Sequence, residues 1–386
     1  MRRALRSRKA LLVALLTVGA LALPALAAAK PVLAVGDQKA SMFADARFRW
    51  LNIRHSRLVV SWRIEQTQWE RELVAQWMDG AKRAGVHPLI AFGHVWGGKR
   101  RTELPSVKEY TRTVADFRKR YPWVRDYTPW NEANHCSQPT CKHPASAASY
   151  YNVLRARCKN CTVVAADVLD QPNMVPWLRS FRRHANGHPR LWGLHNYLDA
   201  NSLRTSGTQH LLKAVKGTIW MTETGGIVRR THYRKQIAGF EESPAHAATA
   251  TAWILRLANR YPRIRRVYLY QWNANSTTQV WDSGLIGVFG ERRPGFDVLA
   301  RAMGRDPNQA PEGPGATPGP PPFNEQPPPT DSSKPPPPSS DQQPPSGGGG
   351  SGGGGSPSPT PTPPPAPVPP PPPPCPLPVC TIGVGG

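Results

Sequence analysis

Two glutamates in this chain stand where a pair of carboxylates could do chemistry together. Glu132 lies in the segment Tyr127-Thr-Pro-Trp-Asn-Glu-Ala-Asn134, and Glu223 lies in Ile219-Trp-Met-Thr-Glu-Thr-Gly-Gly226. Each follows or closes a short apolar run with the character of a strand. Two carboxyl groups that face each other across a cleft can cleave a glycosidic bond. The sequence therefore predicts this chemistry, provided that the fold brings the two positions together.

Eight segments have the apolar character and the flanking turn residues of strands, and amphipathic segments separate them. The eight segments are 32–37, 57–62, 87–93, 126–131, 162–167, 191–197, 218–223 and 266–272. This alternation predicts an α/β fold, a single (β/α)8 TIM barrel of about 250 residues. The C-terminal strand ends of such a barrel open onto one face, so Glu132 and Glu223 should meet there.

Three of the expected helices have recognisable start signals. Thr67-Gln-Trp-Glu70 predicts a capping box, and Gly85 is suited to end the helix that follows it. Ser106-Val-Lys-Glu109 predicts a second capping box. Ser243-Pro244 predicts an N-cap and a first-turn proline for a helix that runs to about Arg260.

The two ends of the chain differ in composition from the part between them. Residues 1–27 have the cationic start, the apolar run and the small-residue cleavage site of a secretory signal peptide. The apolar run is too short to cross a membrane, so we expect export without a transmembrane anchor. Residues 305–386 form a Pro/Gly/Ser-rich tail, which we expect to be disordered because it cannot bury enough apolar surface. The catalytic domain is expected at residues 28–304.

The chain is strongly basic. Its formal net charge is +24, and loss of the five cations of the leader would leave +19. Such a charge favours anionic cell-envelope polymers as neighbours. Many of the cations are expected near helix C-termini, where they would simply complement the helix dipole. No nucleic-acid-binding motif accompanies the charge, so we do not expect DNA or RNA as a partner.

Six cysteines form three close pairs along the chain: Cys136 and Cys141, Cys158 and Cys161, and Cys375 and Cys380. Local disulfides are the usual state of such pairs in an exported protein. The alternative is a four-thiolate metal site built from the first two pairs. The sequence by itself does not fix the connectivity. We expect no metal and no other cofactor.

Polar and aromatic residues recur at the C-terminal ends of the predicted strands. They are Asp37, Gln38, Trp62, Arg63, His94, Trp96, Asn131, Glu132, Asp167, His195, Asn196, Tyr197, Glu223, Gln271, Trp272 and Asn273. A barrel with a purely structural role would not need such residues there, because catalytic groups of barrels come from these strand ends. Asp167, Asp199 and Asp282 could each contact a substrate or cap a loop, and the sequence does not separate the two roles.

In these motifs the sequence resembles the clan A glycoside hydrolases, a group of retaining (β/α)8 enzymes. In that clan the acid/base glutamate follows an asparagine at the end of strand 4, as in Trp130-Asn-Glu-Ala-Asn134, and the nucleophile ends strand 7, as in Trp220-Met-Thr-Glu-Thr-Gly-Gly226. Further similarity lies in His195-Asn-Tyr197, Tyr270-Gln-Trp272 and Trp281-Asp-Ser-Gly284, with Arg293-Pro294 after it. Ala133 stands where the clan often has proline, which leaves the two glutamates in place.

The resemblance implies a role for each of these residues. Glu132 would be the general acid and base, with a pKa raised by the charge of Glu223, and Glu223 would be the nucleophile. Tyr197 would donate a hydrogen bond to Glu223, and Asn131 would bond the 2-hydroxyl of the sugar. The remaining substrate-binding candidates are His94, His195, the sugar platform Trp272, and Trp62, Trp96 and Trp281.

The sequence thus predicts a secreted, monomeric glycoside hydrolase that cleaves β-linked polysaccharide or oligosaccharide substrates with retention of configuration. Two alternatives use the same barrel. One is a catalytically silent barrel that binds glycan at the cell envelope, and the other is a transglycosylase with the same two glutamates. The sugar, the linkage and the choice between internal and terminal cleavage depend on loop shapes that the sequence does not give.

Overall fold

The computed structural model describes residues 30–96, 99–230, 240–279 and 281–313. The predicted signal peptide, the third cysteine pair and the tail beyond residue 313 lie outside the described residues. Residues 305–313 belong to the described part although the sequence assigned them to the tail. Pro307 is buried there, and its carbonyl oxygen accepts a hydrogen bond from Arg292. The domain therefore continues past the predicted boundary at residue 304.

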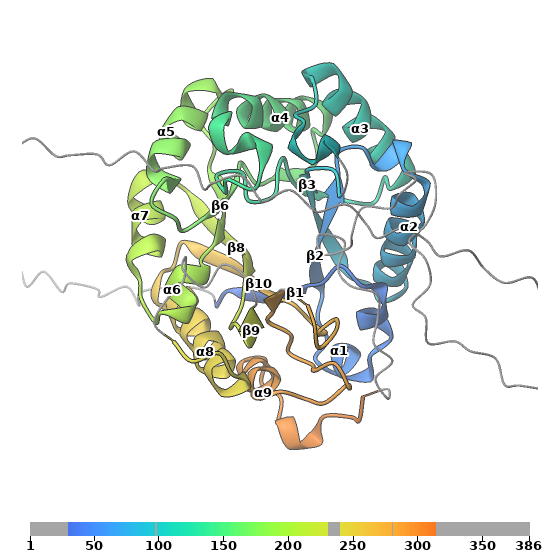
Figure 1. Cartoon of the computed structure of the whole chain (residues 1–386), viewed down its shortest axis with the longest axis vertical. Helices are drawn as coiled ribbons and strands as arrows, with labels where there is room; N and C mark the ends of the chain where they lie inside the picture. The colour runs from blue at the N-terminus through green and yellow to red at the C-terminus, as the bar shows by residue number, and fades with distance from the viewer. Residues whose placement is uncertain (1–29, 97–98, 231–239, 280, 314–386) are drawn as a thin grey trace, which may run out of the picture. The chain divides into compact units, whose positions relative to one another are not determined.

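The framework of the domain is one sheet of nine parallel strands with helices around it (Figure 1). Its strands are β1 (Val32–Gly36), β2 (His55–Ser61), β3 (His87–Gly93), β4 (Asp126–Thr128), β5 (Thr162–Val163), β6 (Asp167–Leu169), β7 (Leu191–His195), β8 (Thr218–Thr224) and β10 (Ile264–Tyr270). Their order across the sheet is β5, β4, β3, β2, β1, β10, β8, β7 and β6. The two end strands are consecutive in the chain, which suggests a closed ring.

Backbone hydrogen bonds between β5 and β6 complete that ring. The amide of Val164 donates to Tyr127 on β4, whereas the amide of Ala165 donates to Leu191 on β7 and the carbonyl of Ala166 accepts from Gly193. β5 and β6 are thus two parts of one interrupted strand that pairs with β4 on one side and β7 on the other. Within the described residues, the sheet has eight strand positions, and each overlaps a predicted segment. The predicted (β/α)8 barrel is confirmed.

The helices lie outside the strands. They are α1 (Ala46–Trp50), α2 (Gln68–Arg83), α3 (Val107–Arg120), α4 (Pro144–Arg157), α5 (Met174–His184), α6 (Tyr197–Asn201), α7 (Ser206–Ala214), α8 (Pro244–Arg260) and α9 (Pro294–Ala302). Short 3₁₀ helices span Ala40–Ala44, Ile64–Gln66, Lys99–Thr102, Pro139–Lys142 and Pro307–Gln309, and a small antiparallel pair joins β9 (Arg229–Arg230) to β11 (Trp281–Asp282). None of the helices in the described part is long and apolar enough to cross a membrane.

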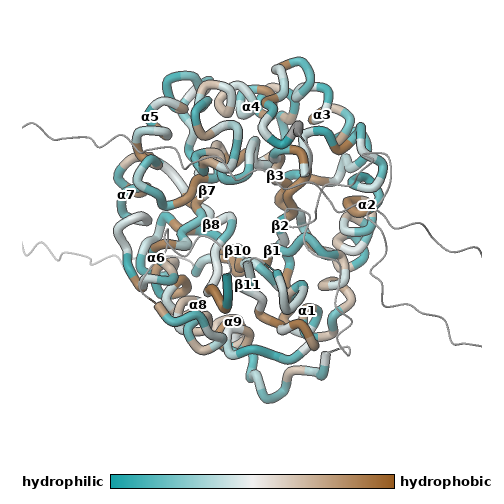
Figure 2. Tube along the Cα trace, viewed as in Figure 1, coloured by the Kyte–Doolittle hydropathy of each residue, from teal (hydrophilic) through white to brown (hydrophobic). Residues whose placement is uncertain are grey.

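Burial of the strands explains why their sequences are apolar on both faces. Strands such as β2, β3 and β7 are the most hydrophobic parts of the trace in Figure 2, whereas the helices carry polar residues as well. Most buried side chains pack between strands and helices. A separate cluster of side chains comes mainly from alternate strands, as expected for a layer inside a barrel; its members are Ala34, Leu89, Val164, Trp220 and Tyr268.

Two of the three helix start signals are confirmed. Ser106 and Glu109 form the reciprocal capping box at α3, and Ser243 caps α8 through the amide of His246. The box predicted at α2 is wrong, because the side chain of Thr67 makes no capping hydrogen bond. Glu70, its expected partner, is instead only 1 % exposed. Its carboxyl group is buried, whereas the prediction had it cap the start of α2.

The first two cysteine pairs are disulfides, Cys136 with Cys141 and Cys158 with Cys161. Local pairing, the usual arrangement in exported proteins, is confirmed for these four residues. The pairs do not combine into the four-thiolate alternative. The first disulfide closes a small loop before α4, and the second closes a small loop after it.

The burial of Glu70 predicts a pH-dependent change in stability on substitution. Burial raises the pKa of Glu70 to about 8, against opposing hydrogen bonds from Ser61 and the backbone of Trp96. Ionisation of the folded protein is therefore more costly than ionisation of the unfolded chain, and stability is lost as the pH rises from about 4.5 through about 8. We expect Glu70→Gln to raise the melting temperature at pH 8.5 by on the order of 5 °C, and to change it little at pH 4.5.

Thermal unfolding followed by circular dichroism across this pH range measures the effect. Glu65→Gln is the matched control, because Glu65 forms an ion pair with Arg120 at the protein surface. A shift of the same size for Glu70→Gln at both pH values would contradict the proposed cost of burying its charge.

Candidate active site

Glu132 and Glu223 meet at one end of the barrel. Glu132 follows β4, Glu223 lies near the end of β8, and His195 ends β7 between them. One carboxylate oxygen from each glutamate and a ring nitrogen of His195 all lie within 4.8 Å of one another. The side chains of Glu132 and Glu223 are 21 % and 13 % exposed, so both can be reached from solvent. The fold therefore brings together the two carboxylates that the sequence singled out.

A β-bulge turns Glu223 toward this cluster. Gly193 on β7 pairs with Trp220 on β8, but two positions later His195 pairs with Glu223, so β8 has one extra residue. Bulges of this kind redirect a side chain that strict alternation would point to the other face of a strand. Thr222 and Glu223 consequently both contact groups inside the barrel. Thr222 donates to Asp167 at 2.9 Å.

Arg57 on β2 is the central cation of the site. Its guanidinium donates to Glu223 at 2.6 Å, to the amide oxygen of Asn131 at 2.6 Å and to Asp167 at 2.9 Å. The side chains of Arg57 and Asp167 are almost fully buried. This role of Arg57 was not predicted from the sequence, where Arg57 only begins a strand segment. The available signal was a cation directly before the apolar run Leu58-Val-Val60, where a buried, unpaired charge would be very costly.

Asp167 is a buried carboxylate that holds other side chains of the site in place. It accepts from Arg57 and Thr222, and its carboxylate lies 3.6 Å from His195. Gly193 makes room for it, because a Cβ atom at that position would lie only 2.0 Å from the carboxylate. Asp167 takes neither of the two roles left open by the sequence, because it is fully buried and its carboxylate accepts hydrogen bonds from Arg57 and Thr222.

His195 is the second cation. It contacts Glu132 through Nδ1 at 3.3 Å and Asp167 through Nε2 at 3.6 Å. Burial disfavours its charge, but the negative charge of Glu223 and the contacts with the carboxylates of Asp167 and Glu132 outweigh burial and raise its pKa to about 9. His195 is therefore protonated at neutral pH. Its position beside both glutamates suits a residue that orients them.

The pKa of Glu132 differs from the expectation. We expected the charge of Glu223 to raise it, but its pKa lies below the ordinary value for a glutamate. Burial raises the pKa, and the hydrogen bond and charge of His195 reverse that effect. The sequence could not reveal this, since it depends on how closely protonated His195 approaches the carboxylate.

The backbone of Glu132 is held in an unusual conformation. Its φ of +47° lies in the left-handed region, which is costly for a residue with a side chain. The adjacent residues are fixed by strands on either side: the amide of Asn131 donates to Phe92 and that of Ala133 to Asp167. These bonds compensate the strain and direct the carboxyl group of Glu132 toward His195.

Tyr197 and Trp281 complete the surroundings of Glu223. The hydroxyl of Tyr197 donates to Glu223 at 3.0 Å, as the resemblance implied. The ring of Trp281 on β11 packs edge-on against Tyr197 with 5.0 Å between the ring centres, and it is only partly buried. Of the four tryptophan candidates, Trp281 is the one that the structure places beside these catalytic candidates with exposed surface.

The structure does not bring the ring of Trp272 to the site. Trp272 is fully buried, donates from its ring to Asp45 at 3.0 Å and packs between Phe48 and Phe296. A ring without exposed surface cannot form the sugar platform expected from the sequence. Trp62 and Trp96 are also buried in the main core, at 2 % and 5 % exposure. Their expected sugar contacts are not met in this structure either.

The remaining candidates occupy supporting positions. His94 is 7 % exposed and forms a hydrogen bond through Nδ1 to Gln138; burial lowers its pKa to about 4. Asp199 caps the start of α7 through the amides of Gly207 and Thr208. Asp282 forms a two-point ion pair with Arg293. Of the two roles left open by the sequence, Asp199 therefore has the capping role. Asp282 is held by its ion pair with Arg293.

The three closest groups could in principle surround a metal ion, because Glu132, His195 and Glu223 each offer one ligand atom. A histidine ligand must be neutral, however, and the pKa of His195 is raised to about 9. Glu223 is already paired with Arg57 at 2.6 Å. The charges of this site therefore suit the reactions of two carboxylates better than they suit a bound cation.

The charge pattern predicts a measurable coupling between His195 and Glu223. We expect an NMR titration of the histidine side chains to show a pKa of about 9 for His195. Glu223→Gln should lower that pKa, because it removes the negative charge that stabilises the imidazolium. His94, with a pKa of about 4, is the internal control and should not change. A His195 pKa that stays at about 9 in the variant would refute the coupling.

Part of the sequence matches a known group of enzymes. Residues 93–281, from the end of β3 to β11, match a family model described as the glycosyl hydrolase catalytic core. The match includes Glu132 and Glu223. No curated protein sequence matches the chain significantly.

Several solved structures share the fold. A GH5_18 variant from Streptomyces cattleya, in complex with Manβ1-4GlcNAc, is 14 % identical over 73 % of this chain and 82 % of its own, with a TM-score of 0.53. A GH10 endoxylanase from a sugarcane soil metagenome is 12 % identical over 71 % and 97 %, with a TM-score of 0.51. A GH5_18 variant from Bifidobacterium longum is also 12 % identical, over 71 % and 78 %, with a TM-score of 0.51.

These structural likenesses concern the fold, and the family match concerns the catalytic core. The structural likenesses agree with the barrel, and the matched region contains both glutamates. The matched region identifies the chain as a glycoside hydrolase, and the chain shares its barrel fold with the GH5_18 and GH10 structures.

Proposed function

We propose that the chain is a retaining β-glycosidase that acts on a polysaccharide by double displacement, with Glu132 as acid and base and Glu223 as nucleophile. The observation that carries the proposal is the approach of the two glutamates, which have carboxylate oxygens within 4.8 Å of each other. Retaining enzymes hold their two carboxyl groups about 5–5.5 Å apart, whereas inverting enzymes separate them by about 6.5–9.5 Å to admit a water molecule. The short separation favours retention.

In the first step Glu223 attacks the anomeric carbon while protonated Glu132 gives its proton to the departing glycosidic oxygen. The bond to the leaving group breaks, and an ester bond forms between the sugar and Glu223. Arg57 and Tyr197 donate to the two oxygens of Glu223, at 2.6 and 3.0 Å. They fix the direction of attack and leave a lone pair of the carboxylate for the new bond.

In the second step Glu132, now a carboxylate, accepts a proton from water as the water oxygen attacks the anomeric carbon. The ester bond breaks, Glu223 leaves as a carboxylate, and the product has the configuration of the substrate. A sugar hydroxyl in place of water would give transglycosylation with the same residues. Water and sugar therefore compete for one intermediate.

His195 supplies the proton that the first step needs. In the free protein that proton is on His195, because its pKa is raised to about 9 and the pKa of Glu132 is lowered. We infer that substrate binding shifts it from Nδ1 to the Glu132 oxygen 3.3 Å away. Attack by Glu223 then removes a negative charge that had stabilised the imidazolium, so neutral His195 becomes favourable as the proton is delivered.

Three features support a β-linked polymer outside the cell as the substrate. The motifs around Glu132 and Glu223 resemble those of a clan that acts mostly on β-glycosides. Two structures with this fold are a complex with Manβ1-4GlcNAc and an endoxylanase. The N-terminal leader motif and the two disulfides are typical of export. We infer that the Pro/Gly/Ser-rich tail acts as a spacer between the enzyme and the cell envelope.

The first test is the stereochemistry of cleavage. We expect ¹H NMR of the initial product from a β-linked oligosaccharide to show the β anomer before mutarotation. Glu223→Ala should lose activity by several orders of magnitude and, with azide, form an α-glycosyl azide, because azide occupies the position of the missing carboxylate. Glu132→Ala should form a β-glycosyl azide from a substrate with a good leaving group.

Glu65→Gln serves as the control, since Glu65 lies on the outer surface in an ion pair with Arg120. Its activity should equal that of the parent protein. An α anomer as the first product would exclude the double displacement. No hydrolysis by the parent protein, together with glycan binding that both active-site variants retain, would favour the silent, glycan-binding barrel.

The second test separates the effect of Arg57 on catalysis from its effect on stability. Arg57→Lys keeps the charge but cannot reach Glu223, Asn131 and Asp167 together. We expect kcat/KM to fall about tenfold to a hundredfold, because hydrogen bonds to charged groups contribute about 1.5–3 kcal/mol. Arg47→Lys is a matched control, as Arg47 is equally buried and paired with Asp45, away from the glutamates.

Both variants should lower the melting temperature, but only Arg57→Lys should lower kcat/KM among the molecules that remain folded. Steady-state kinetics below the melting temperature of each variant distinguishes the two effects. Equal losses of kcat/KM in the two variants would mean that Arg57 acts through stability alone.

A further inference from the structure

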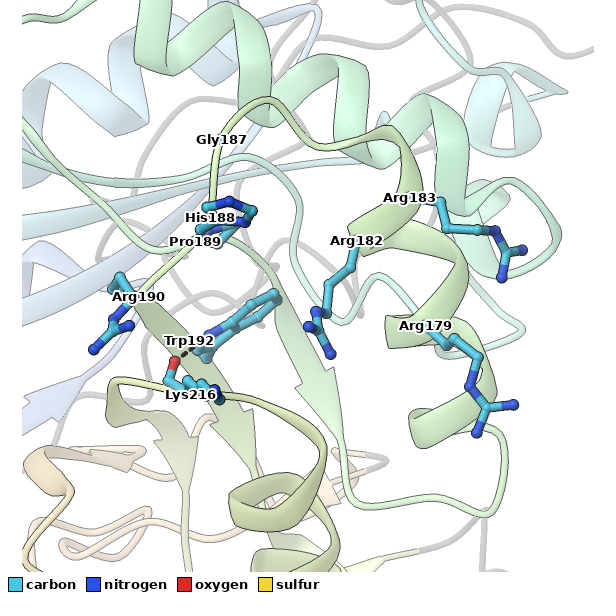
Figure 3. Close-up of a pocket in the computed structure, with 9 residues that line it drawn as sticks. All are labelled: Arg179, Arg182, Arg183, Gly187, His188, Pro189, Arg190, Trp192 and Lys216. Atoms are coloured by element: carbon cyan, nitrogen blue, oxygen red, sulfur yellow. Dashed lines mark hydrogen bonds between the residues drawn. The ribbon is translucent and has the colours of Figure 1, made fainter.

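A cavity with an unusual charge lies away from the glutamates. Its volume is about 660 Å³, and its lining includes five cationic side chains, from Arg179, Arg182, Arg183, Arg190 and Lys216. His188, Pro189 and Trp192 contribute to the same lining, and none of the described residues that line it carries a carboxylate. Figure 3 shows Arg182 extending from α5 toward the ring of Trp192, with Arg190 and Lys216 near that ring.

This basic pocket lies at the end of the barrel opposite the active site. Arg190 directly precedes β7, and Lys216 stands just before β8. His195 and Glu223 lie near the other ends of the same two strands, which run parallel. A molecule in the basic pocket would therefore leave the active site open.

The usual explanation of surface cations accounts for only part of this cluster. Arg182 and Arg183 are in the last turn of α5, where a cation complements the helix dipole. Arg190 and Lys216 are outside helices, so the dipole does not explain them. Among the described residues, none of the five cations forms an ion pair with an acid.

The surroundings add positive charge without neutralising it. Two effects lower the pKa of Arg263: its partial burial, which is the larger, and the positive charge of the nearby Arg190. The guanidinium of Arg263 donates to three backbone carbonyls, those of Leu212, Val215 and Gly217. Arg182 likewise donates to the carbonyl of Ala214 at 2.9 Å. Backbone carbonyls thus hold Arg182 and the neighbouring Arg263 in place, and the excess positive charge of the pocket favours an anionic partner.

The shape and composition favour an acidic sugar chain over a small ion. Guanidinium groups bind carboxylates in two-point contacts, and several cations could each take one carboxylate of a repeating chain. A cavity of about 660 Å³ has room for sugar rings, whereas a single phosphate would fill a small part of it. The indole of Trp192 and the ring of Pro189 provide apolar surface for the faces of such rings.

We propose that the basic pocket at the start of β7 and β8 binds a carboxylate-bearing polysaccharide, such as a polyuronate, and holds the enzyme on an acidic glycan while the opposite end of the barrel stays open to its substrate. This binding site is independent of the two glutamates. In this proposal, part of the positive charge of the domain has a specific function, which is to bind the carboxylates of the glycan.

Isothermal titration with a short de-esterified oligogalacturonide tests the proposal on the full chain carrying Glu223→Gln, which prevents turnover. We expect binding that weakens markedly when NaCl rises from about 50 to about 300 mM, because salt screens the exposed charges. Arg182→Gln with Arg190→Gln should raise the Kd at least about tenfold. Lys216→Gln alone should raise the Kd less. Among the described residues, the substitution breaks no hydrogen bond of the Lys216 side chain, because Trp192 bonds only to the backbone carbonyl of Lys216.

The matched control is Lys82→Gln with Arg83→Gln, which removes two exposed cations from the last turn of α2. It should leave the Kd unchanged, and melting temperatures check that each variant is folded. Equal Kd values for the pocket double variant and the control would overturn the proposal. So would equal binding of the methyl-esterified oligosaccharide, or binding of tripolyphosphate without any binding of the uronide.

The binding measurement does not depend on the reaction. An enzyme that inverted configuration, or showed no hydrolysis, could still bind the uronide and confirm the pocket. In an active parent protein, the pocket double variant should retain its turnover of a small neutral β-glycoside. A parallel loss of that turnover would show that the substitutions disturb the barrel, and it would contradict an independent site.

Discussion

The contacts of one buried arginine hold the active site together. Arg57 reaches from β2 to groups that follow or belong to three other strands: Asn131 after β4, Asp167 on β6 and Glu223 on β8. Removing a guanidinium from water is costly, and two carboxylates must lie close to it to compensate that cost. The same requirement positions Glu223, because it can pair with Arg57 only from inside the barrel. The ion pair therefore fixes the geometry of the site more than it stabilises the fold.

The balance of charge follows from this arrangement. Three carboxylates, those of Glu132, Asp167 and Glu223, surround the two cations Arg57 and His195. Asp167 contacts both cations, so it links the environment of one glutamate to that of the other. A change in charge at Glu223 is consequently felt at His195 and, through its hydrogen bond, at Glu132. Such coupling allows one proton to serve both halves of a double displacement.

Much of the framework could be predicted from the sequence, since it depends on patterns within single segments. Apolar runs marked all eight strand positions, and the motifs around Glu132 and Glu223 located the pair. Arg57 was missed because its partners come from strands that only the closed barrel brings near it. Trp272 was misplaced for a related reason, as a strand-end residue points either toward the site or toward a helix, and the local register decides which.

Glu70 shows the same limit at a helix start. The pattern of a capping box is local, but the choice between capping a helix and entering the core depends on what packs over that helix. The pKa of Glu132 was mispredicted for a similar reason. The direction of its change is set by His195, which is 63 positions further along the chain. Patterns within single segments thus predicted the helices and strands. The burial and the pKa values of the ionisable side chains depend on contacts between segments.

A parallel barrel also separates two kinds of site along the same strands. β7 begins beside Arg190 in the basic pocket and ends at His195 in the acidic site, and β8 links Lys216 to Glu223 in the same way. Because all its strands run in one direction, the barrel places their starts at one end and their finishes at the other. Positive charge can accumulate at the first end without weakening the carboxylates at the second, since solvent and salt screen exposed charges over about 10 Å. An enzyme with this fold can therefore hold an acidic polymer with one end and keep the carboxylate chemistry of the other end intact.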